Sequence, residues 1–322
     1  MLQDTFGRRF YYLRLSVTDI CNFRCTYCLP NGYQGKPEQA FLSPIELEKV
    51  ARAFAQMGTQ KVRLTGGEPS LRTDLPDIIA RISDIDSIQT VALTTNGYKL
   101  PTRVKSWVDA GLTQLNVSID SLDPNEFHKI TGHNRLEEIL EGIAEAKSLG
   151  LKVKVNSVLM KGLNDDLTPV LNWLKKTPVT LRYIEVMETS DQQVFFRQHH
   201  VSGLSLKDQL LGKGWQPVMR EIAAGPAQEF WHPNYAGRIG LIMPYSKDFC
   251  ATCNRLRVSS LGKLHLCLFA EQGIDIRPYL QNDVPESEII EAVTRHVQGK
   301  SVSHYLQSHN SGALSNLSQI GG

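Results

Sequence analysis

The sequence lacks a long apolar run and an excess of charge of either sign. No apolar stretch approaches the length of a membrane-spanning helix, and the first residues, MLQDTFGRRFYYL, contain no apolar signal core. A net charge of +2 over 322 residues gives no global basic field for nucleic acid or a membrane surface. We therefore expect a cytoplasmic protein that binds neither. Any polyanionic ligand has to be held by a local group of Lys and Arg.

Cysteine is scarce and unevenly placed. The six cysteines form two groups of three, Cys21, Cys25 and Cys28, then Cys250, Cys253 and Cys267. No cysteine lies between the groups, a division that a disulfide framework does not explain. Cytosolic thiols stay reduced, so clustered cysteines there more often bind metal or take part in chemistry.

Short β-type segments alternate with longer helical segments over the first 190 residues. We predict strands at residues 11–18, 61–65, 90–96, 114–120, 152–160 and 180–187. We predict helices at residues 43–58, 74–83, 100–111, 135–150 and 167–176, the first opened by a Ser43–Glu46 capping box. The alternation indicates a parallel sheet with right-handed crossovers, which a barrel and a doubly wound sheet both satisfy.

The strands carry one apolar and one polar face. In the first strand Leu13, Leu15 and Val17 alternate with Arg14 and other polar residues, and three further strands repeat the pattern. A closed barrel fills its interior with aliphatic side chains, so the polar faces favour a partial, open (β/α)6 barrel with a wet lumen that holds a ligand. An antiparallel sheet with one solvated face is the alternative, and the long helical segments argue against it. We expect residues 1–190 to form this core and residues 191–322 to pack on the barrel and close it.

The first cysteine group reads CNFRCTYC and follows the first strand, at the end of a βα sheet where ligands bind. Structural zinc sites use four ligands, usually in CxxC pairs, whereas this segment supplies three. Iron–sulfur cubanes are held by cysteine thiolates, normally four of them. Three thiolates leave one iron open to bind a small molecule directly.

The segment resembles the CxxxCxxC motif of radical S-adenosylmethionine (SAM) enzymes. The resemblance implies a TIM-like partial (β/α)6 core with a [4Fe–4S] cluster on Cys21, Cys25 and Cys28, whose open iron binds SAM. It also implies SAM contacts from Tyr27, Gly66, Gly67, Glu68, Ser118 and Met187. Taken alone, the GGEP segment is a strand-ending turn, Ser118 a polar strand residue and Met187 core filler.

The second cysteine group has the spacing CxxC-x13-C. Local spacing leaves a Cys3His zinc site open, with His265 as the fourth ligand. The segment CNRLRVSSLGKLHLC resembles the signature of the molybdenum cofactor biosynthesis protein A family, and so do RLTGGEP, LTTNG, NVSIDSL and the terminal Gly321-Gly322. That resemblance implies a second [4Fe–4S] cluster on Cys250, Cys253 and Cys267, with His265 a bystander and the Gly-Gly tail reaching the active site.

Basic residues on the polar strand faces suit a phosphate ligand. Arg14, Arg63 and Lys154 lie on such faces, while Arg255 and Arg257 share one side of NRLRV. Solvated surface charge is the ordinary alternative for any one of them. The resemblance makes these five residues, with Thr94 and Leu256, contacts to GTP. We expect Arg255 and Arg257 to be catalytic, by stabilising charge that develops in the reaction.

The family resemblance implies a GTP 3′,8-cyclase, a radical SAM lyase. A 5′-deoxyadenosyl radical would take H3′ of GTP, and the C3′ radical would attack guanine C8 to give 3′,8-cyclo-7,8-dihydro-GTP. The partners implied are GTP, a flavodoxin- or ferredoxin-like electron donor, and a cyclic pyranopterin monophosphate synthase that receives the product. A radical SAM peptide maturase and a non-enzymatic iron–sulfur or zinc protein stay open as alternatives, as does a monomer or a homodimer.

Overall fold

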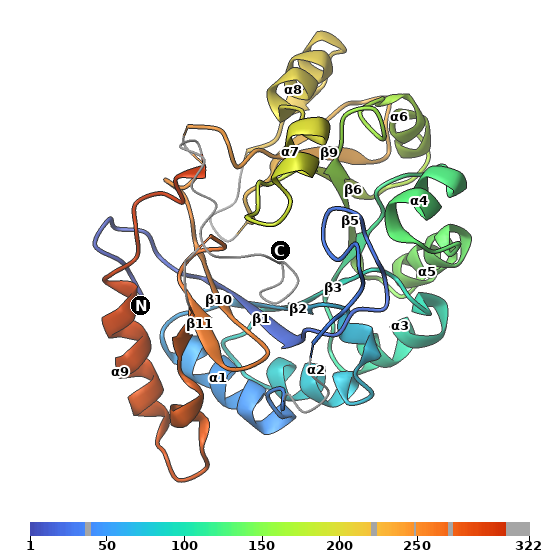
Figure 1. Cartoon of the computed structure of the whole chain (residues 1–322). Coiled ribbons are helices and arrows are strands. Elements are labelled where there is room, and N and C mark those ends of the chain that lie inside the picture. Colours follow the sequence, from blue (N-terminus) through green and yellow to red (C-terminus); the bar gives the residue numbers. More distant parts are fainter. Residues whose placement is uncertain (36–39, 220–223, 248, 270–272, 307–322) are drawn as a thin grey trace.

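One curved sheet surrounds a central space in the computed structural model, which describes residues 1–35, 40–219, 224–247, 249–269 and 273–306 (Figure 1). Within these residues the sheet has twelve strands in the order β12-β11-β10-β1-β2-β3-β4-β5-β6-β9-β8-β7. Its centre is formed by β1 (Tyr12–Thr18), β2 (Lys61–Gly66), β3 (Thr90–Thr95), β4 (Gln114–Ser118), β5 (Lys152–Leu159) and β6 (Thr180–Glu185). These six strands pair in parallel and match the six predicted strands to within two residues.

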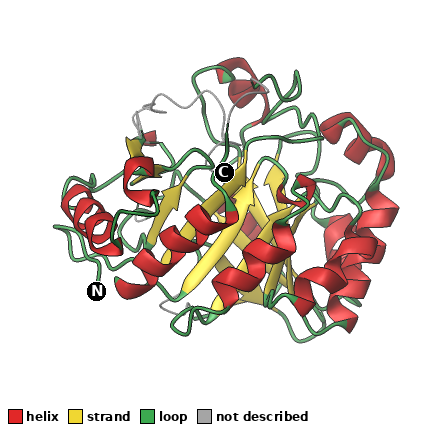
Figure 2. Ribbon diagram, turned by 90° about the horizontal axis from the view of Figure 1, so that it is seen from below, coloured by secondary structure: helices red, strands yellow, loops and turns green. Residues whose placement is uncertain are grey.

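Helices cover the outer face of the sheet, as Figures 1 and 2 show. The predicted helices are α1 (Pro44–Gln56), α2 (Leu75–Ser83), α3 (Leu100–Asp109), α5 (Leu136–Ser148) and α6 (Thr168–Leu174). The structure adds η1 (Pro69–Leu71) and α4 (Pro124–Thr131). The apolar strand residues Leu13, Leu15 and Val17 are fully buried beneath the helices, which confirms the predicted polarity of the two faces.

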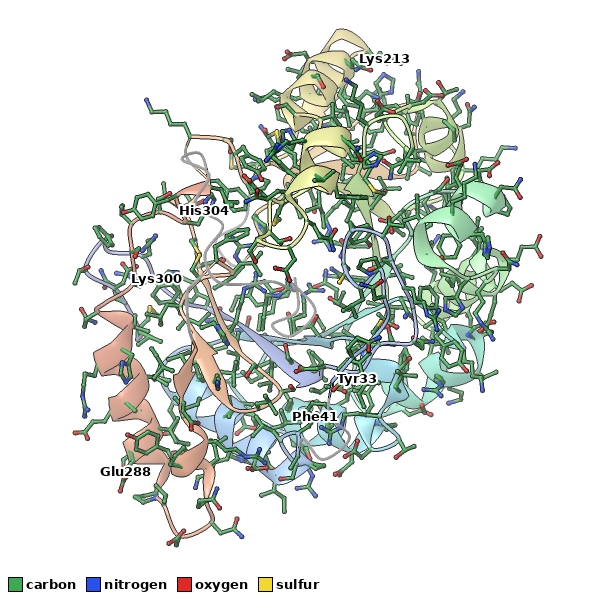
Figure 3. The ribbon with its side chains drawn as sticks, viewed as in Figure 1. Tyr33, Phe41, Lys213, Glu288, Lys300 and His304 are labelled. Carbon is green, nitrogen blue, oxygen red and sulfur yellow. The ribbon has the colours of Figure 1, made fainter. Side chains whose placement is uncertain are left out.

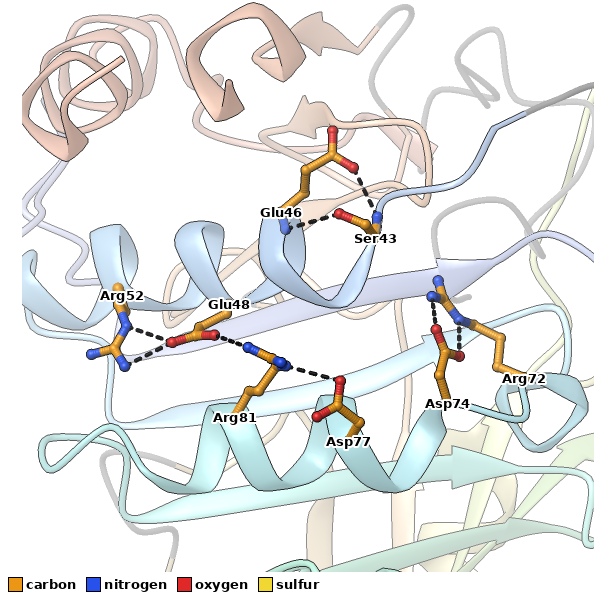
Figure 4. Close-up of polar contacts among 8 residues, drawn as sticks. All are labelled: Ser43, Glu46, Glu48, Arg52, Arg72, Asp74, Asp77 and Arg81. Atoms are coloured by element: carbon orange, nitrogen blue, oxygen red, sulfur yellow. Dashed lines mark hydrogen bonds and ion pairs between the residues drawn. The ribbon is translucent and has the colours of Figure 1, made fainter. Parts of the chain in front are cut away.

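The start of α1 shows how local sequence fixes an element (Figure 4). Ser43 Oγ accepts a hydrogen bond from the Glu46 amide, and the Glu46 carboxylate accepts one from the Ser43 amide, so the predicted capping box is confirmed. Further along α1, Glu48 forms ion pairs with Arg52 of the same helix and Arg81 of α2. These contacts tie the first two helices together over β1 and β2.

The C-terminal region lengthens both edges of the sheet. β9 (Arg238–Ile242) runs parallel to β6, and β10 (Arg255–Val258) runs parallel to β1. Beyond them lie four antiparallel strands, β8 (Gln228–Trp231), β7 (Gln216–Pro217), β11 (Lys263–His265) and β12 (Ile274–Asp275). Within the described chain β12 and β7 are not paired, so the partial barrel is confirmed while its sheet stays open.

The C-terminal region also contains helices. They are α7 (Gln193–His199), α8 (Gly203–Gly212), η2 (Arg277–Leu280) and α9 (Glu286–Val297), the last packed beside α1 (Figure 1). β6 and β9 pair directly across the boundary predicted at residue 190, and that boundary stays a prediction. No helix among the described residues is both long and apolar enough to cross a bilayer. Gly321 and Gly322 lie outside the described residues.

Candidate active site

A cavity of about 870 Å³ occupies the inside of the sheet. Its described lining residues include one carboxylate, Glu229, and ten cationic side chains, Arg14, Lys61, Arg63, Lys147, Lys152, Lys154, Arg182, Arg238, Arg255 and Arg257. The chain as a whole carries a net charge of only +2, so its positive charge is concentrated here. The five basic residues predicted for a phosphate site all line this cavity. A site of this composition selects a multiply charged anion.

The strand register aligns the arginines. Arg14 on β1 lies level with Arg63 on β2 and with Arg257 on β10, so three guanidinium groups project from neighbouring strands at one height. Burial, together with repulsion between these groups, lowers the pKa of Arg14 to about 10 and that of Arg182 to about 9. Both stay charged at neutral pH. Crowded cations at these positions are stabilised by an anion that neutralises them.

Polar neighbours hold the cations in place. Arg63 donates a hydrogen bond to Thr94 Oγ1 at 3.2 Å, and Arg182 donates one to Asn156 Oδ1 at 2.6 Å. Lys154 pairs with Glu229 at 2.6 Å. Thr94 therefore supports Arg63 from the side. The Leu256 side chain is buried in the apolar core, so any contact from this residue to the cavity has to come from its backbone.

Sequence reasoning missed Lys61 and Arg182. Lys61 shares the inward parity of Arg63 on β2 and donates a hydrogen bond to Gln114 at 2.6 Å. Arg182 lies on the inward face of TLRYIE on β6 together with Thr180 and Ile184, and its side chain is buried. The alternation rule that identified Arg14 and Arg63 finds both residues once it is applied to every strand.

The first cysteine group lies in the loop after β1, where the strands end. Backbone amides of Arg24 and Thr26 donate to the carbonyls of Thr131 and Ile130 at 3.1 and 2.9 Å. Asn96 Nδ2 at the end of β3 lies 4.0 Å from Cys21 Sγ. The loop is thus fixed to the end of α4 and to β3. The mouth of the sheet holds all three thiols.

The donor set in this loop fits an iron–sulfur cluster. Burial raises the pKa of Cys21 to about 11 and holds that of Cys25 well above its usual range. The negative charges of Asp120 and of the other two cysteines raise the pKa of Cys25 further. A metal centre removes such protons, because thiolates are the ligands. Tyr27 Oη donates to Asp120 Oδ2 at 2.9 Å, which fixes the aromatic residue beside the last cysteine.

The GGEP segment supports the cysteine loop. A Cβ at Gly66 would lie 2.1 Å from the Thr18 carbonyl oxygen, and one at Gly67 would lie 2.3 Å from that of Ile20. Gly66 also has a φ of +140°, which favours glycine. The buried Glu68 carboxylate accepts bonds from the amides of Ser70 and Asn96 and from Thr95 Oγ1, which ties β2 to β3. These glycines are required by close backbone packing, a reason that the sequence did not reveal.

Two further residues predicted to contact SAM lie at or just after strand ends. Ser118 is the last residue of β4 and is half-buried, and Met187 follows β6 and lines the cavity. Their contacts with SAM, like those of Tyr27 and the GGEP segment, stay a prediction.

The second cysteine group lines the cavity beside β10. Burial raises the pKa of Cys253, but the positive charges of Arg255 and Lys300 outweigh it and bring the pKa to about 7. Cys250 accepts hydrogen bonds from the His304 backbone and the Ser303 side chain. Residues 300–304, which we call the strap, therefore cross this group, and Figure 3 labels Lys300 and His304 on it.

His265 lies opposite Arg257 in the β10–β11 pair and is buried. Its Nε2 would lie 2.5 Å from a Cβ at Gly273, so this ring is packed against the backbone. Among the described residues, no three His, Cys, Asp or Glu side chains are grouped so as to hold one metal ion. Since this finding applies equally to the two cysteine groups, it does not decide between the ligand sets, and the fourth-ligand role of His265 stays a prediction.

Comparisons with known proteins agree with this geometry. Residues 15–174 match the radical SAM superfamily, and residues 179–306 match the family described as Molybdenum Cofactor Synthesis C. Streptococcus suis SuiB bound to S-adenosylmethionine superposes with a TM-score of 0.63 at 12% identity, over 88% of this chain and 68% of that chain. HydG, a maturase of the [FeFe]-hydrogenase, gives 0.50 at 15% identity over 64% and 49%. At these identities the likeness concerns the fold.

The fold and the cysteine loop define a radical SAM enzyme with an open barrel, as the first matched region indicates. With both regions matched in this order, the chain belongs to the molybdenum cofactor biosynthesis protein A family of the radical SAM superfamily.

Proposed function

We propose that this radical SAM enzyme of molybdenum cofactor biosynthesis is a GTP 3′,8-cyclase. The observation that carries the proposal is the cavity, which sets ten cationic side chains against one carboxylate among its described lining residues. GTP carries about four negative charges at neutral pH, which suits a site built from guanidinium and ammonium groups. A neutral peptide substrate would gain nothing from this arrangement.

The second cysteine group lines the cavity, and the first group lies in the loop at the strand ends, so the two groups would supply two reactive centres. Cys21, Cys25 and Cys28 would hold a [4Fe–4S] cluster that binds SAM and, when reduced, supplies the 5′-deoxyadenosyl radical. Cys250, Cys253 and Cys267 would hold a second cluster. The low pKa of Cys253 and the adjacent Arg255 suit this role, because positive charge favours the thiolate. The guanine base would lie beside this second group.

The chain's own residues would bind and orient GTP. Arg14, Arg63 and Arg257 form a level row for phosphate oxygens, with Lys61 beside Arg63 on β2 and with Lys154 and Arg182 across the lumen. Fixing the triphosphate at the strand starts directs the ribose toward the cysteine loop at the strand ends. Positioning of this kind is the main contribution a protein makes to radical chemistry. Arg255 and Arg257 would stabilise charge that develops on the nucleotide.

The partners follow from the same proposal. The enzyme would take electrons from a flavodoxin- or ferredoxin-like donor. It would pass 3′,8-cyclo-7,8-dihydro-GTP to a cyclic pyranopterin monophosphate synthase.

The test is an anaerobic reaction of the reconstituted enzyme with SAM, dithionite and GTP deuterated at C3′. We expect deuterium in 5′-deoxyadenosine and a cyclised nucleotide product. Cleavage of SAM without that transfer would refute the cyclase assignment. Metal analysis separates the non-enzymatic zinc alternative, since two cubanes require about eight irons per chain. Calorimetry with GTP separates a peptide maturase, which has no reason to bind it.

A further inference from the structure

Tyr12 is a buried residue that the proposed chemistry leaves unused. It is the first residue of β1, lines the cavity and is 3% exposed. Its hydroxyl oxygen accepts a hydrogen bond from Arg63 Nε and is also bonded to the Arg14 guanidinium. The Lys61 ammonium lies 5.4 Å from the centre of its ring. Tyr12 therefore sits between cations of two neighbouring strands.

Positive groups face Tyr12 from several strands. They are Arg14 on β1, Lys61 and Arg63 on β2, Arg182 on β6, and Arg255 and Arg257 on β10. Glu229 of β8 is the carboxylate of the described lining, and it pairs with Lys154 on the far side of the lumen. In the row of Arg14, Arg63 and Arg257, the Tyr12 hydroxyl can carry negative charge beside Arg14 and Arg63, and the Cys267 thiol can do so beside Arg257.

The electrostatic balance at Tyr12 favours the phenolate. Burial raises the pKa of Tyr12, but the positive charges of Arg63, Arg14 and Lys61 outweigh it and lower the pKa to about 7. Tyr183 on β6 is the contrasting case, because it is equally buried in the apolar core and burial raises its pKa. The two tyrosines differ in the cations around them.

We propose that Tyr12 is the internal counter-ion of this cation cluster and takes up a proton when a polyphosphate binds there. The inference rests on the proposed function only in that GTP supplies the polyphosphate. In the ligand-free protein the phenolate neutralises part of the charge of Arg14 and Arg63. Phosphate oxygens then take over those guanidinium groups. The phenolate forms an O–H bond with a proton taken from a buffer acid, whose bond to that proton breaks and which is left as its conjugate base, and no oxidation state changes.

Binding coupled to proton uptake weakens as pH rises. Above the pKa of Tyr12, at about 7, the apparent GTP affinity should fall by up to about tenfold per pH unit. Lys61 adds to the decline, because burial and the charge of Arg63 lower its pKa to about 8. Because the pKa of Tyr12 lies below that of Lys61, most of the proton uptake near neutral pH belongs to Tyr12.

The experiment is anaerobic calorimetry of GTP binding to the holoenzyme at pH 7.5, in buffers that differ in ionisation enthalpy. We compare wild type with Tyr12→Phe and with the matched control Tyr183→Phe, and repeat each titration with inorganic triphosphate. Wild type and Tyr183→Phe should take up protons when the ligand binds, and Tyr12→Phe should lose most of that uptake. Iron content and circular dichroism check that each variant is folded.

The outcomes separate the two proposals. Equal proton uptake by wild type and Tyr12→Phe overturns the counter-ion role while leaving GTP binding intact. Binding of triphosphate with Tyr12-dependent uptake, but no binding of GTP, supports the counter-ion role and refutes the nucleotide assignment. Failure of wild type to bind either ligand refutes both. If Tyr12→Phe does not fold, the wild type is tested by ultraviolet difference spectra recorded as the ligand binds. A loss of tyrosinate absorbance that parallels the proton uptake supports the counter-ion role. Proton uptake without that loss overturns it.

Discussion

A buried ion pair near the N-terminus should hold in place the chain segment that covers the second cysteine group. Arg8 Nε donates to Asp4 Oδ2 at 2.6 Å, and the two side chains are 6% and 0% exposed. The other nitrogens of Arg8 donate to the carbonyls of Ser301 and Val302 in the strap at 2.7 and 2.9 Å. Arg8 also reaches the Cys250 carbonyl at 3.4 Å. The pair thus anchors the segment that covers Cys250.

Asp4→Asn keeps the side-chain volume and removes the negative charge. Asp4 Oδ1 accepts from the amides of Phe6 and Arg8, both at 3.0 Å, and an amide oxygen can still do so. The Asn nitrogen then faces Arg8 as a second donor, which leaves a buried cation without its partner. Breaking a buried pair in this way costs about 3–5 kcal/mol. With a urea slope of about 3 kcal/mol per M, the unfolding midpoint should fall by about 1–1.7 M.

Asp109→Asn is the matched control. Lys105 and Asp109 have the same i,i+4 spacing and lie 2.8 Å apart, but their side chains are 69% and 61% exposed. An exposed pair of this kind contributes about 0.3–0.5 kcal/mol, so its midpoint should move by about 0.2 M or less. Urea titrations monitored by tryptophan fluorescence and by iron absorbance measure both variants. Asp4→Asn should also lose iron first from the second group. A shift no larger than that of the control would refute the anchoring argument.

Three further perturbations probe the site. Gly67→Ala should displace the first cysteine loop, because its Cβ would lie 2.3 Å from the Ile20 carbonyl oxygen. Iron analysis should then show that about half of the iron is lost. A full iron content with normal SAM cleavage would contradict this prediction. Arg182→Ala should weaken GTP binding about 10–100-fold through loss of a buried charged donor, while cleavage of SAM without GTP stays unchanged. Lys61 loses its charge as pH rises through its pKa of about 8, so Lys61→Arg should lessen the fall in GTP affinity above that pH, and an identical profile in calorimetry would refute a role for this charge.

Local pattern predicted the centre of the fold because each strand there carries its own signal. Leu13, Leu15 and Val17 alternate with polar residues, and the helices that follow have apolar faces and caps. The pairing of the outer strands could not be predicted, because it joins segments that are far apart in the sequence. β9 and β10 are short and follow irregular segments, and their parallel pairing with β6 and β1 is a long-range choice that no local pattern reports.

The site was predictable to the same extent. Residues that alternate on a strand, such as Arg14 and Arg63, could be assigned to the lumen from parity, and Arg182 follows by the same rule. Other contacts join segments that are far apart in the sequence. Examples are the hydrogen bonds of Glu68 with Thr95 and Asn96, and the hydrogen bond that Arg8 donates to the strap. Such contacts become visible only when the chain is folded. In the sequence Tyr12 is an ordinary aromatic residue of a strand, and only the folded structure shows the cations that surround it.

The pairing of β10 with β1 relates the two cysteine groups to opposite ends of one strand. Arg255 lies level with Tyr12 at the start of β1, so Cys253 approaches the cavity at that level, while Cys21 follows the far end of the same strand. β1 spans seven residues, so at about 3.3 Å per residue its two ends lie about 20 Å apart. Under the proposed function, SAM at the first cysteine group and a nucleotide at the second would approach each other along this strand. The row of Arg14, Arg63 and Arg257 lies between the two ends and would hold the phosphates of that nucleotide.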